Sequence, residues 1–415
     1  MNQSEGYTRR INVSKHILVV AQYYYPELFR INDLTSEWVK RGYKVTVLTG
    51  IPNYPQGKYF DGYGLFKKRK DTYNGASIIR IPLIARGHSS FTLMMNYLSF
   101  VISGFFWKSF TNVKADYVFI FEVSPMTQAL VGVWYAKRRK IPCYLYVQDL
   151  WPENVEIMTG IKNKSIINMI GNMVDYIYKG CNKIFTTSRS FIKAINSRGF
   201  DESKLEYWPQ YAEDFCTYTD KMHVAEIAES DSFDVIFAGN IGNAQGLDIL
   251  VQAAQIIKKD SEKVIRFVIV GDGRYKEELI NLIDNNALND MFLFIPKQPS
   301  TRIPEFVSVC DAAFLSLADN PIFEMTIPAK LQTYMSCGKV IIASAAGETQ
   351  NIIKEANCGL CSKPGDSEVL AENILLLAGM TKEQLDKMGL NASEYCRIHF
   401  SKDVLLEHMD YYFNL

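Results

Sequence analysis

The chain has 415 residues, and its 45 Lys and Arg residues balance its 45 Asp and Glu residues to a formal net charge of zero. This length predicts two domains, and the neutral balance gives no sign of a nucleic-acid partner. Hydrophobic residues make up 48% of the chain and charged residues 22%, proportions typical of a folded soluble protein.

The N-terminal segment and the cysteines predict a cytoplasmic protein. Residues 1–15 are polar and lack the apolar stretch of a secretion signal. The eight cysteines are irregularly spaced apart from Cys358 and Cys361, and one pair at this spacing is weak support for a metal or redox site. We therefore expect eight reduced thiols.

The first half of the chain alternates short apolar runs with helical patterns. A helix is expected at 33–42, with Gly42 as its stop. This alternation predicts a parallel sheet covered by helices on both faces. The expected strands are 16–21, 45–48, 77–81, 117–121, 144–147 and 183–187.

The most apolar stretch of the chain, residues 91–106, has two interpretations. It is shorter than a membrane-spanning helix needs, so it fits a buried helix of the first domain. It also fits a helix that lies in a membrane interface, because Trp107, Lys108 and the basic run 67–70 are side chains that suit an anionic lipid surface.

The same rhythm restarts in the second half, after a polar and acidic segment that we interpret as the hinge. We expect domains at 1–210 and 231–397, joined by a linker at 211–230. A final helix, 398–415, is expected to pack back on the first domain. The expected strands of the second half are 233–240, 266–273, 292–295, 312–317 and 339–344.

Glycine-rich loops follow two strands of the second half, whereas the first strand of the chain is followed by residues 22–26, which hold no glycine. That absence argues against a dinucleotide cofactor. Gly239, Gly242 and Gly246 would let backbone N–H groups approach a phosphate, although a plain tight turn explains them as well. The second loop, 271–274, ends in Arg274, which faces either a phosphate or solvent.

A helix after Pro328 and before Gly338 carries Lys330 in its first turn. A cation at a helix N-terminus is favourable if an anion such as a diphosphate docks there, and otherwise Lys330 is an ordinary surface residue. The chain has no Asp-x-Asp pair, the usual holder of a divalent ion on a diphosphate. We therefore expect a mechanism without a metal.

Three side chains after the strand at 144–147 are candidates for a site in the first domain. Asp149, Trp151 and Glu153 follow the strand end, where ligands of open α/β sheets bind. A capped loop with the tryptophan packed in the core is the alternative.

In their order along the chain, several segments resemble family-four retaining glycosyltransferases, and in particular the N-acetyl-L-fucosamine transferase branch of O-antigen and capsule assembly. The segments that carry the resemblance are YYYPE, RGYKVTVLTGIPNYPQG, VQDLWPE, QYAEDF, FAGNIGNAQGLDILVQAA, GDGRYKEEL and TIPAKLQTYMSCGKVIIAS.

The resemblance implies an α/β protein with the GT-B fold, in which two Rossmann-like, doubly wound domains face each other across a cleft. It implies a UDP-sugar donor, with an N-acetylated 6-deoxyhexosamine as the sugar, bound by the second domain. The acceptor implied is an undecaprenyl-diphosphate saccharide, bound by the first domain at the inner face of the cytoplasmic membrane. The enzyme would retain anomeric configuration and be peripheral to that membrane.

The site residues implied fall into three groups. Asp149, Glu324 and Lys330 are expected in catalysis: to orient sugar, to hold donor hydroxyls and to stabilise the leaving diphosphate. The acceptor group is Arg30, Asn32, Tyr54, Trp151 and Glu153. The donor group is Gly239, Asn240, Gly242, Gln245, Gly271, Gly273, Arg274, Pro328 and Gln332.

The chain departs from the pattern of this family at several of these places. Gln148 stands where many members have His, so no role for a histidine carries over. Asn240 and Gln245 replace an Arg and a Lys that clamp the diphosphate, and Thr333 replaces the second of two glutamates. Two other functions stay open: a non-catalytic scaffold that binds a nucleotide-sugar, and a nucleotide-sugar epimerase of the same fold.

Overall fold

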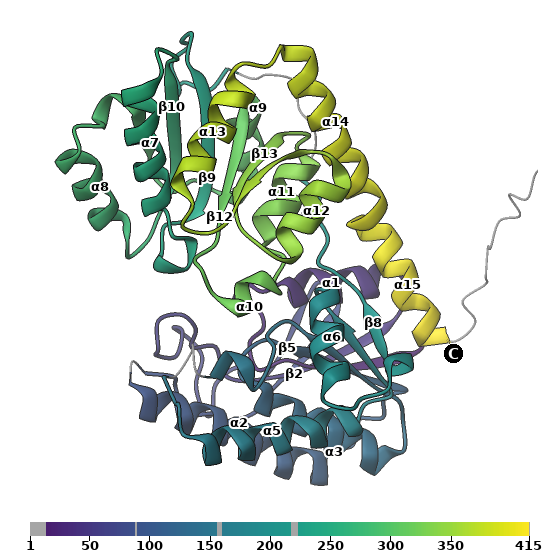
Figure 1. Cartoon of the computed structure of the whole chain (residues 1–415). Helices are drawn as coiled ribbons and strands as arrows, with labels where there is room; N and C mark the ends of the chain where they lie inside the picture. The colour runs from purple at the N-terminus through teal and green to yellow at the C-terminus, as the bar shows by residue number, and fades with distance from the viewer. Residues whose placement is uncertain (1–13, 88, 156–159, 217–222, 415) are drawn as a thin grey trace, which may run out of the picture. The chain divides into compact units, whose positions relative to one another are not determined.

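The computed structural model describes residues 14–87, 89–155, 160–216 and 223–414. Most of the polar N-terminal segment and part of the expected linker lie outside these residues. The contacts divide the chain into two compact units, residues 1–187 with 191–207, and residues 188–190 with 208–415 (Figure 1). The expected packing of the final helix on the first domain stays a prediction.

The first unit is built on an eight-stranded sheet in the order β3-β4-β2-β1-β5-β6-β7-β8. All neighbours are parallel except β3 and β4. All five residues of β1 are buried, since this strand lies between β2 and β5 and under helices. The strands are β1 His16–Val20, β2 Lys44–Thr49, β3 Lys70–Tyr73, β4 Ala76–Arg80, β5 Tyr117–Glu122, β6 Cys143–Val147, β7 Lys183–Thr186 and β8 Leu205–Tyr207.

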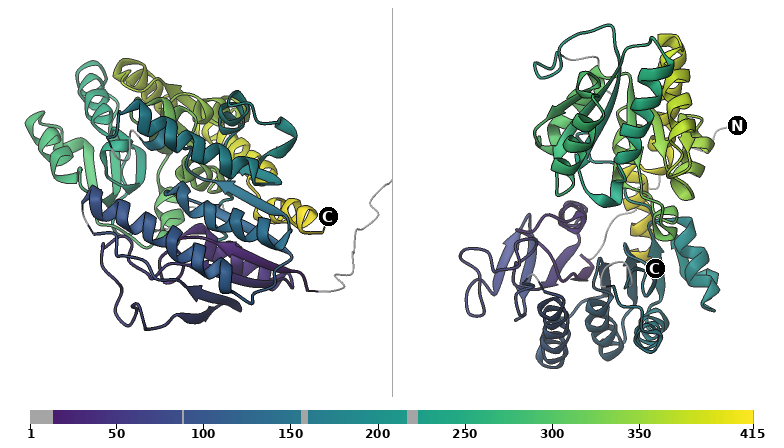
Figure 2. Two further views of the ribbon diagram at one scale, coloured as in Figure 1. Left: turned by 90° about the horizontal axis from the view of Figure 1, so that it is seen from below. Right: turned by 60° about the vertical axis from the view of Figure 1, so that its left-hand side comes forward.

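Helices cover both faces of this sheet, with α2, α3 and α5 together on one of them (Figure 1; Figure 2, left). The expected helix at 33–42 begins earlier and ends earlier in the structure, because Phe29 is extended and Gly42 lies in the left-handed region. The helices are α1 Arg30–Lys40, α2 Ser90–Phe110, α3 Ala129–Arg139, α5 Lys164–Lys179 and α6 Arg189–Ser197.

Helix α2 is not the buried helix of the first interpretation. Only Asn96, Phe100 and Gly104 are buried along its 21 residues. Ser89 and Thr92 form a reciprocal capping box that fixes where the helix begins. By length and composition this one helix of the described chain could cross a membrane, although just 17% of its most apolar window is buried in the protein.

The second unit has a six-stranded, fully parallel sheet in the order β11-β10-β9-β12-β13-β14. Its helices pack on both faces, and α7 and α13 cover one side of its hydrophobic core. The strands are β9 Phe233–Asn240, β10 Ile265–Asp272, β11 Phe292–Ile295, β12 Ala312–Ser316, β13 Val340–Ser344 and β14 Gly359–Ser362. The helices are α7 Asp248–Asp260, α8 Lys276–Asn285, α9 Ile303–Val309, α10 Pro321–Glu324, α11 Ala329–Ser336, α12 Glu348–Ala356, α13 Ser367–Ala378, α14 Lys382–His399 and α15 Lys402–Asn414.

Both sheets reverse their strand order at a central strand, which is where open α/β sheets bind ligands. In the first unit β2 and β5 lie on opposite sides of β1, and in the second β10 and β12 lie on opposite sides of β9. The doubly wound α/β architecture expected from the sequence is confirmed in both units. All eight cysteines carry free thiols, seven of them buried.

Candidate functional site

At the carboxyl ends of β9 and β10, glycines let the two backbones lie close together. Gly239 and Gly271 pair across the two strands, at φ angles of 145° and 156°. A Cβ atom on Gly271 would lie 1.9 Å from the Gly239 carbonyl oxygen, and one on Gly273 would lie 2.0 Å from that of Ile241. Gly271 and Gly273 are therefore required by strand and loop packing, whatever else they bind.

Gly239 has a different neighbour. A Cβ atom there would lie 2.5 Å from Cε and 3.1 Å from Nζ of Lys330, so the lysine side chain runs over this glycine. Lys330 is the second residue of α11, and its Nζ lies 4.8 Å from the centroid of the Phe237 ring. The structure thus brings Lys330, at the start of α11, into contact with the glycine loop that follows β9.

Burial lowers the pKa of Lys330 to about 8. Among the described residues no carboxylate contributes to this shift, and desolvation of the ammonium group is its one cause. The side chain lies at the N-terminus of α11, where backbone N–H groups lack partners within the helix. A half-buried cation at this place is suited to an anionic ligand.

The loop after β9 is closed by its own residues. The N–H of Gly242 donates to Oε1 of Gln245 at 3.1 Å, and Gly246 takes a left-handed conformation before α7 begins. The N–H of Ala318 donates to the Ala244 carbonyl at 3.0 Å, which ties this loop to the segment after β12. Gln245 thus shapes the loop, while Asn240 is exposed at the strand end.

The segment between β12 and β13 places Glu324 and Pro328 at the same edge of the sheet. Glu324 ends α10, its side chain is exposed, and its carbonyl would be 2.0 Å from a Cβ atom on Gly347. Pro328 is extended and directly precedes α11. Arg274 is exposed in the loop after β10.

Gln332 is oriented differently from the other predicted donor residues. Its side chain is buried, and its Nε2 donates to the carbonyl of Gln210 at 2.6 Å. The described contact links α11 to the segment that follows β8, so Gln332 holds backbone in place.

In the first unit, Asp149 lies beside a second carboxyl group that the sequence analysis missed. Its Oδ2 accepts the N–H of Ser124 at 2.7 Å, and its own N–H points to Oε2 of Glu122 at 3.4 Å. Glu122 ends β5 in full burial, which raises its pKa well above the ordinary value, with the nearby Asp149 as a further cause. The signal in the sequence was the single acid at the end of the apolar run YVFIFE.

The two remaining candidates after β6 differ in their exposure to solvent. Trp151 is 5% exposed, and its indole N–H donates to Oγ of Ser124 at 3.1 Å, as the alternative of a tryptophan packed in the core predicted. Glu153 is exposed two residues later. Trp151 therefore supports the loop that holds Asp149, because both bond to Ser124.

A second missed carboxylate, Glu27, organises the loops after β1 and β2. It accepts the N–H groups of Asn53 and Tyr54 at 2.7 Å and that of Tyr24 at 3.2 Å. Burial raises its pKa to about 7, against the lowering effect of these three bonds. Asn32, a predicted acceptor residue, is buried and donates to the Glu27 carbonyl at 2.7 Å.

Tyr54 joins a cluster of aromatic rings beside this carboxylate. Its centroid lies 5.4 Å from that of Tyr23 and 5.5 Å from that of Phe29, and the Arg86 guanidinium lies 5.2 Å from the Tyr54 ring. Burial raises the pKa of Tyr97, and the charged neighbours that contribute include Arg86 and Asp149. The charges of Asp149 and of Arg86, which contacts the Tyr54 ring, thus both act on Tyr97.

Arg30, the last predicted acceptor residue, begins α1 and is half-buried. Its positive charge opposes the rise in pKa that burial causes at Tyr146 of β6, the strand that precedes Asp149.

No group of three or more His, Cys, Asp or Glu side chains is arranged for a metal ion within the described ranges. A mechanism without a metal stays a prediction.

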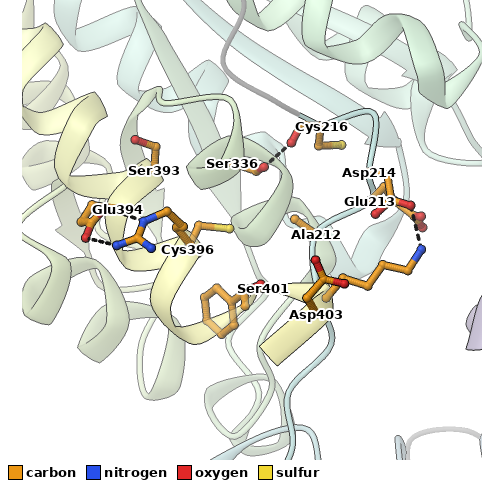
Figure 3. A pocket seen from close by; sticks show the side chains of 13 residues that line it. Ala212, Glu213, Asp214, Cys216, Ser336, Ser393, Glu394, Cys396, Ser401 and Asp403 are labelled. Atoms are coloured by element: carbon orange, nitrogen blue, oxygen red, sulfur yellow. Dashed lines mark hydrogen bonds and ion pairs between the residues drawn. The ribbon is translucent and has the colours of Figure 1, made fainter. Parts of the chain in front are cut away.

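A pocket of about 430 Å³ in the second unit lies apart from all the predicted residues (Figure 3). It is formed by residues 212–216, the end of α11, α14 and the start of α15. Four of its charged side chains form two ion pairs, Lys402 with Asp214 and Arg397 with Glu394, each at 2.7 Å. We interpret it as a packing gap where the chain segment after β8 meets the last helices.

Comparisons with known proteins bear on the family and the fold. Residues 219–395 match the family described as Glycosyl transferases group 1. The chain is similar to an Escherichia coli (strain K12) protein provisionally described as the colanic acid biosynthesis glycosyl transferase WcaI. The two are 24% identical over 383 residues, which covers 86% of this chain and 91% of the relative.

Two solved structures share the fold over nearly the whole chain. Sucrose-phosphate synthase from Thermosynechococcus elongatus superposes with a TM-score of 0.73 at 15% identity, covering 96% of this chain and 98% of that one. Anabaena Alr3699/HepE, solved in complex with UDP-glucose, gives a TM-score of 0.66 at 14% identity, covering 96% and 99%. The expected GT-B fold is confirmed, and residues 219–395 are similar to the group 1 glycosyl transferases.

Proposed function

We propose that this chain is a retaining glycosyltransferase that moves a sugar from a UDP-sugar to a lipid-linked saccharide without a metal ion. The observation that carries the proposal is Lys330, a half-buried lysine of lowered pKa whose side chain runs over the backbone of Gly239 at the start of α11. A diphosphate is the anion that this combination of cation, helix N-terminus and glycine loop suits best.

In this proposal the second unit binds the donor. Lys330 and the N–H groups at the start of α11 stabilise the negative charge that develops on the departing diphosphate. The exposed carboxylate of Glu324 accepts hydrogen bonds from hydroxyl groups of the donor sugar. Arg274, exposed after β10, contacts the nucleoside part. HepE, which shares the fold, was solved with UDP-glucose, and this supports a UDP-sugar as the first donor to test.

The first unit binds the acceptor in the same proposal. The exposed ring of Tyr54 and the half-buried ring of Phe29, both packed on the buried Tyr23, offer flat apolar faces against which a sugar ring can stack. Asp149, whose carboxylate is held by the Ser124 N–H, orients a sugar hydroxyl. Attack from the face on which the diphosphate departs gives retention of configuration.

The biological setting proposed is the assembly of a bacterial surface polysaccharide, such as an O-antigen or capsule, on undecaprenyl diphosphate. The similarity to a relative described in colanic acid biosynthesis supports this setting. An N-acetylated 6-deoxyhexosamine such as N-acetyl-L-fucosamine is the sugar proposed, and the cytoplasmic face of the inner membrane is the proposed location.

The donor site is tested by thermal unfolding with a panel of nucleotides and nucleotide-sugars, with and without EDTA. A ligand at 100 times its Kd adds about 2.7 kcal/mol to the free energy of unfolding. We expect a rise in Tm with UDP that EDTA leaves unchanged and that Lys330→Ala removes. Lys387→Ala, a change at an exposed lysine of α14, is the matched control.

Turnover separates the proposal from its alternatives. Incubation with a UDP-sugar and a lipid-linked acceptor, followed by NMR of the product, should give the anomeric configuration of the donor. Inversion would refute retention. If a nucleotide raises the Tm but no sugar is transferred to any acceptor, the scaffold is favoured. If the nucleotide-sugar is epimerised in the absence of an acceptor, the epimerase is favoured.

A further inference from the structure

Helix α2 exposes a continuous apolar stripe. The exposed side chains recur every three or four residues, the spacing of one helix face, and the 21-residue helix is about 30 Å long. Seven large apolar residues form the stripe: Phe91, Met94, Leu98, Ile102, Phe105, Phe106 and Phe110. Phe110, at the helix end, is 80% exposed, so nothing in the described chain covers it.

The opposite face of α2 is tied to the first unit by specific contacts. The buried Asn96 donates from Nδ2 to the Ile84 carbonyl at 2.6 Å and accepts from Nε2 of Gln22 at 2.7 Å. Gly104 packs so closely on Val131 of α3 that a Cβ atom would lie 2.3 Å from a valine methyl group. Such a helix lies along the protein surface and does not leave it to cross a bilayer.

Helices α3 and α5 extend this face. In Figure 2 (left) the three helices run side by side, and α3 contacts both of the others. The ring of Trp134 on α3 lies 5.6 Å from that of Phe105 in an edge-on contact. On α5 a second, sparser stripe is exposed, made of Ile166, Met169 and Tyr176, which lie three and seven residues apart and so share one helix face.

The charges on these helices are almost all positive. Helices α2, α3 and α5 together hold one acidic residue, Asp175, and it is paired with Arg198 at 2.6 Å. Their basic residues are Lys108, Lys137, Arg138, Arg139, Lys164 and Lys179. An apolar face with such a basic edge is complementary to an anionic lipid surface.

A loop tip between β2 and β3 adds to the same face. Phe66 is 96% exposed and is followed by two exposed lysines, Lys67 and Lys68. Arg69 donates from Nη1 to the Leu65 carbonyl at 2.9 Å, and with Phe106 and other residues of α2 it lines an apolar hollow of about 440 Å³. The tip is therefore held beside the second half of α2.

We propose that this α2–α5 surface docks the protein on an anionic lipid bilayer. The surface consists of the two apolar stripes and the tip residues Leu65 and Phe66, with the basic side chains around them. The apolar side chains enter the boundary between headgroups and acyl chains, and the lysines and arginines contact the anionic headgroups. This extends the proposed function, because it gives the enzyme a route to a lipid-linked acceptor, yet it depends on no donor or catalytic residue.

The test is cosedimentation of the whole chain with vesicles. Vesicles of phosphatidylethanolamine and phosphatidylglycerol are compared with vesicles of phosphatidylcholine alone, at low and high salt. We expect the chain to bind the anionic vesicles about ten times more strongly than the phosphatidylcholine vesicles. Binding to the anionic vesicles should fall as the salt concentration rises.

Matched variants assign the binding to the surface. The triple change Ile102→Ser, Phe106→Ser and Phe110→Ser should reduce vesicle binding about tenfold or more. The triple change Val264→Ser, Leu376→Ser and Leu390→Ser removes equally exposed apolar side chains from the second unit and should leave binding unchanged. A charge reversal, Lys67→Glu with Lys68→Glu, should weaken binding to anionic vesicles alone.

Equal binding by the wild type and the α2 triple variant would overturn the proposal, as would sedimentation no greater than without vesicles. A wild-type dimer that the α2 variant dissociates, together with absent vesicle binding, would assign the surface to a second copy of the chain instead. The UDP-induced rise in Tm, measured on the same preparations, reports separately on the donor site. Its failure would count against the proposed function and leave the docking surface intact.

Discussion

The lowered pKa of Lys330 makes stability and ligand binding depend on pH in ways that can be measured. Its pKa is about 8 in the folded chain, below the ordinary value of 10.5, because burial disfavours the charged form. The buried charge therefore costs stability below pH 8, and this cost disappears as the pH rises from 8 through 10.5.

The first prediction follows from that cost. Lys330→Met keeps the aliphatic packing over Gly239 and Phe237 and removes the charge, so the free energy of unfolding at pH 7 should rise by about 1–2 kcal/mol. The gain should shrink between pH 8 and 10.5. Urea unfolding at pH 7 and at pH 10 measures both effects, and a variant less stable than the wild type at pH 7 would contradict the argument.

Ligand binding should reverse the pH effect at the same residue. A diphosphate beside Lys330 favours the protonated form and raises its pKa, so UDP affinity should be nearly constant from about pH 7 to 8, where UDP is fully ionised, and should fall about tenfold per unit above pH 8. Titration calorimetry across this range provides the test. In Lys330→Met the dependence should vanish, and a persistent fall in that variant would place the titrating group elsewhere.

The ionisation of Glu27 changes stability with pH in the opposite direction to that of Lys330. Burial raises its pKa from 4.5 to about 7, so its contribution to stability is present below pH 4.5 and is lost as the pH rises through 7. Glu27→Gln should lower stability overall, since one amide cannot accept the three N–H bonds, but should remove this fall between pH 4.5 and 7. Urea unfolding of the wild type and of Glu27→Gln between pH 4.5 and 7 measures this difference. An equal fall in stability in both proteins would contradict the prediction.

At the scale of elements, the junction of β9 and β10 is the least tolerant place described. Gly271→Ala would put a methyl group 1.9 Å from the Gly239 carbonyl, and the backbone there has little room to move. We expect a loss of about 3 kcal/mol or more in the free energy of unfolding, with UDP binding reduced as well. Gly64→Ala, where a Cβ atom meets open space, is the control.

The sequence predicted the elements with strong apolar patterns and missed those without. The buried runs of β1, β5 and β9 were found within a residue or two. The short edge strands β3 and β8 were missed, because a polar run such as KDTY owes its strand conformation to its neighbour in the sheet. Helix α2 was ambiguous, since an apolar run does not reveal what covers it.

The candidate site was predictable to a similar degree. Lys330 and Gly239 follow from helix and loop signals, and they meet in the structure. Glu27 and Glu122 could not be identified, because their importance lies in burial and in backbone partners that come from distant parts of the chain. Gln332 illustrates the reverse case, in which position on α11 suggested a ligand contact and the fold turned the side chain to backbone.

At the scale of the whole molecule, each of the two units has its own sheet and its own core. We therefore expect two calorimetric unfolding transitions. UDP should raise the temperature of one of them alone, and Gly271→Ala should lower that same transition. A single transition that both perturbations move would show that the units unfold together.

The shielded cysteines give the protein a practical property. Seven of the eight thiols are buried, and burial raises the pKa of the half-buried Cys361 to about 12, so thiolate is scarce at neutral pH. In Phe66→Cys the introduced thiol would stand alone in water and react first with a maleimide. A fluorophore attached there would report, by its emission colour, whether that position has moved from water into lipid, without any native cysteine being replaced.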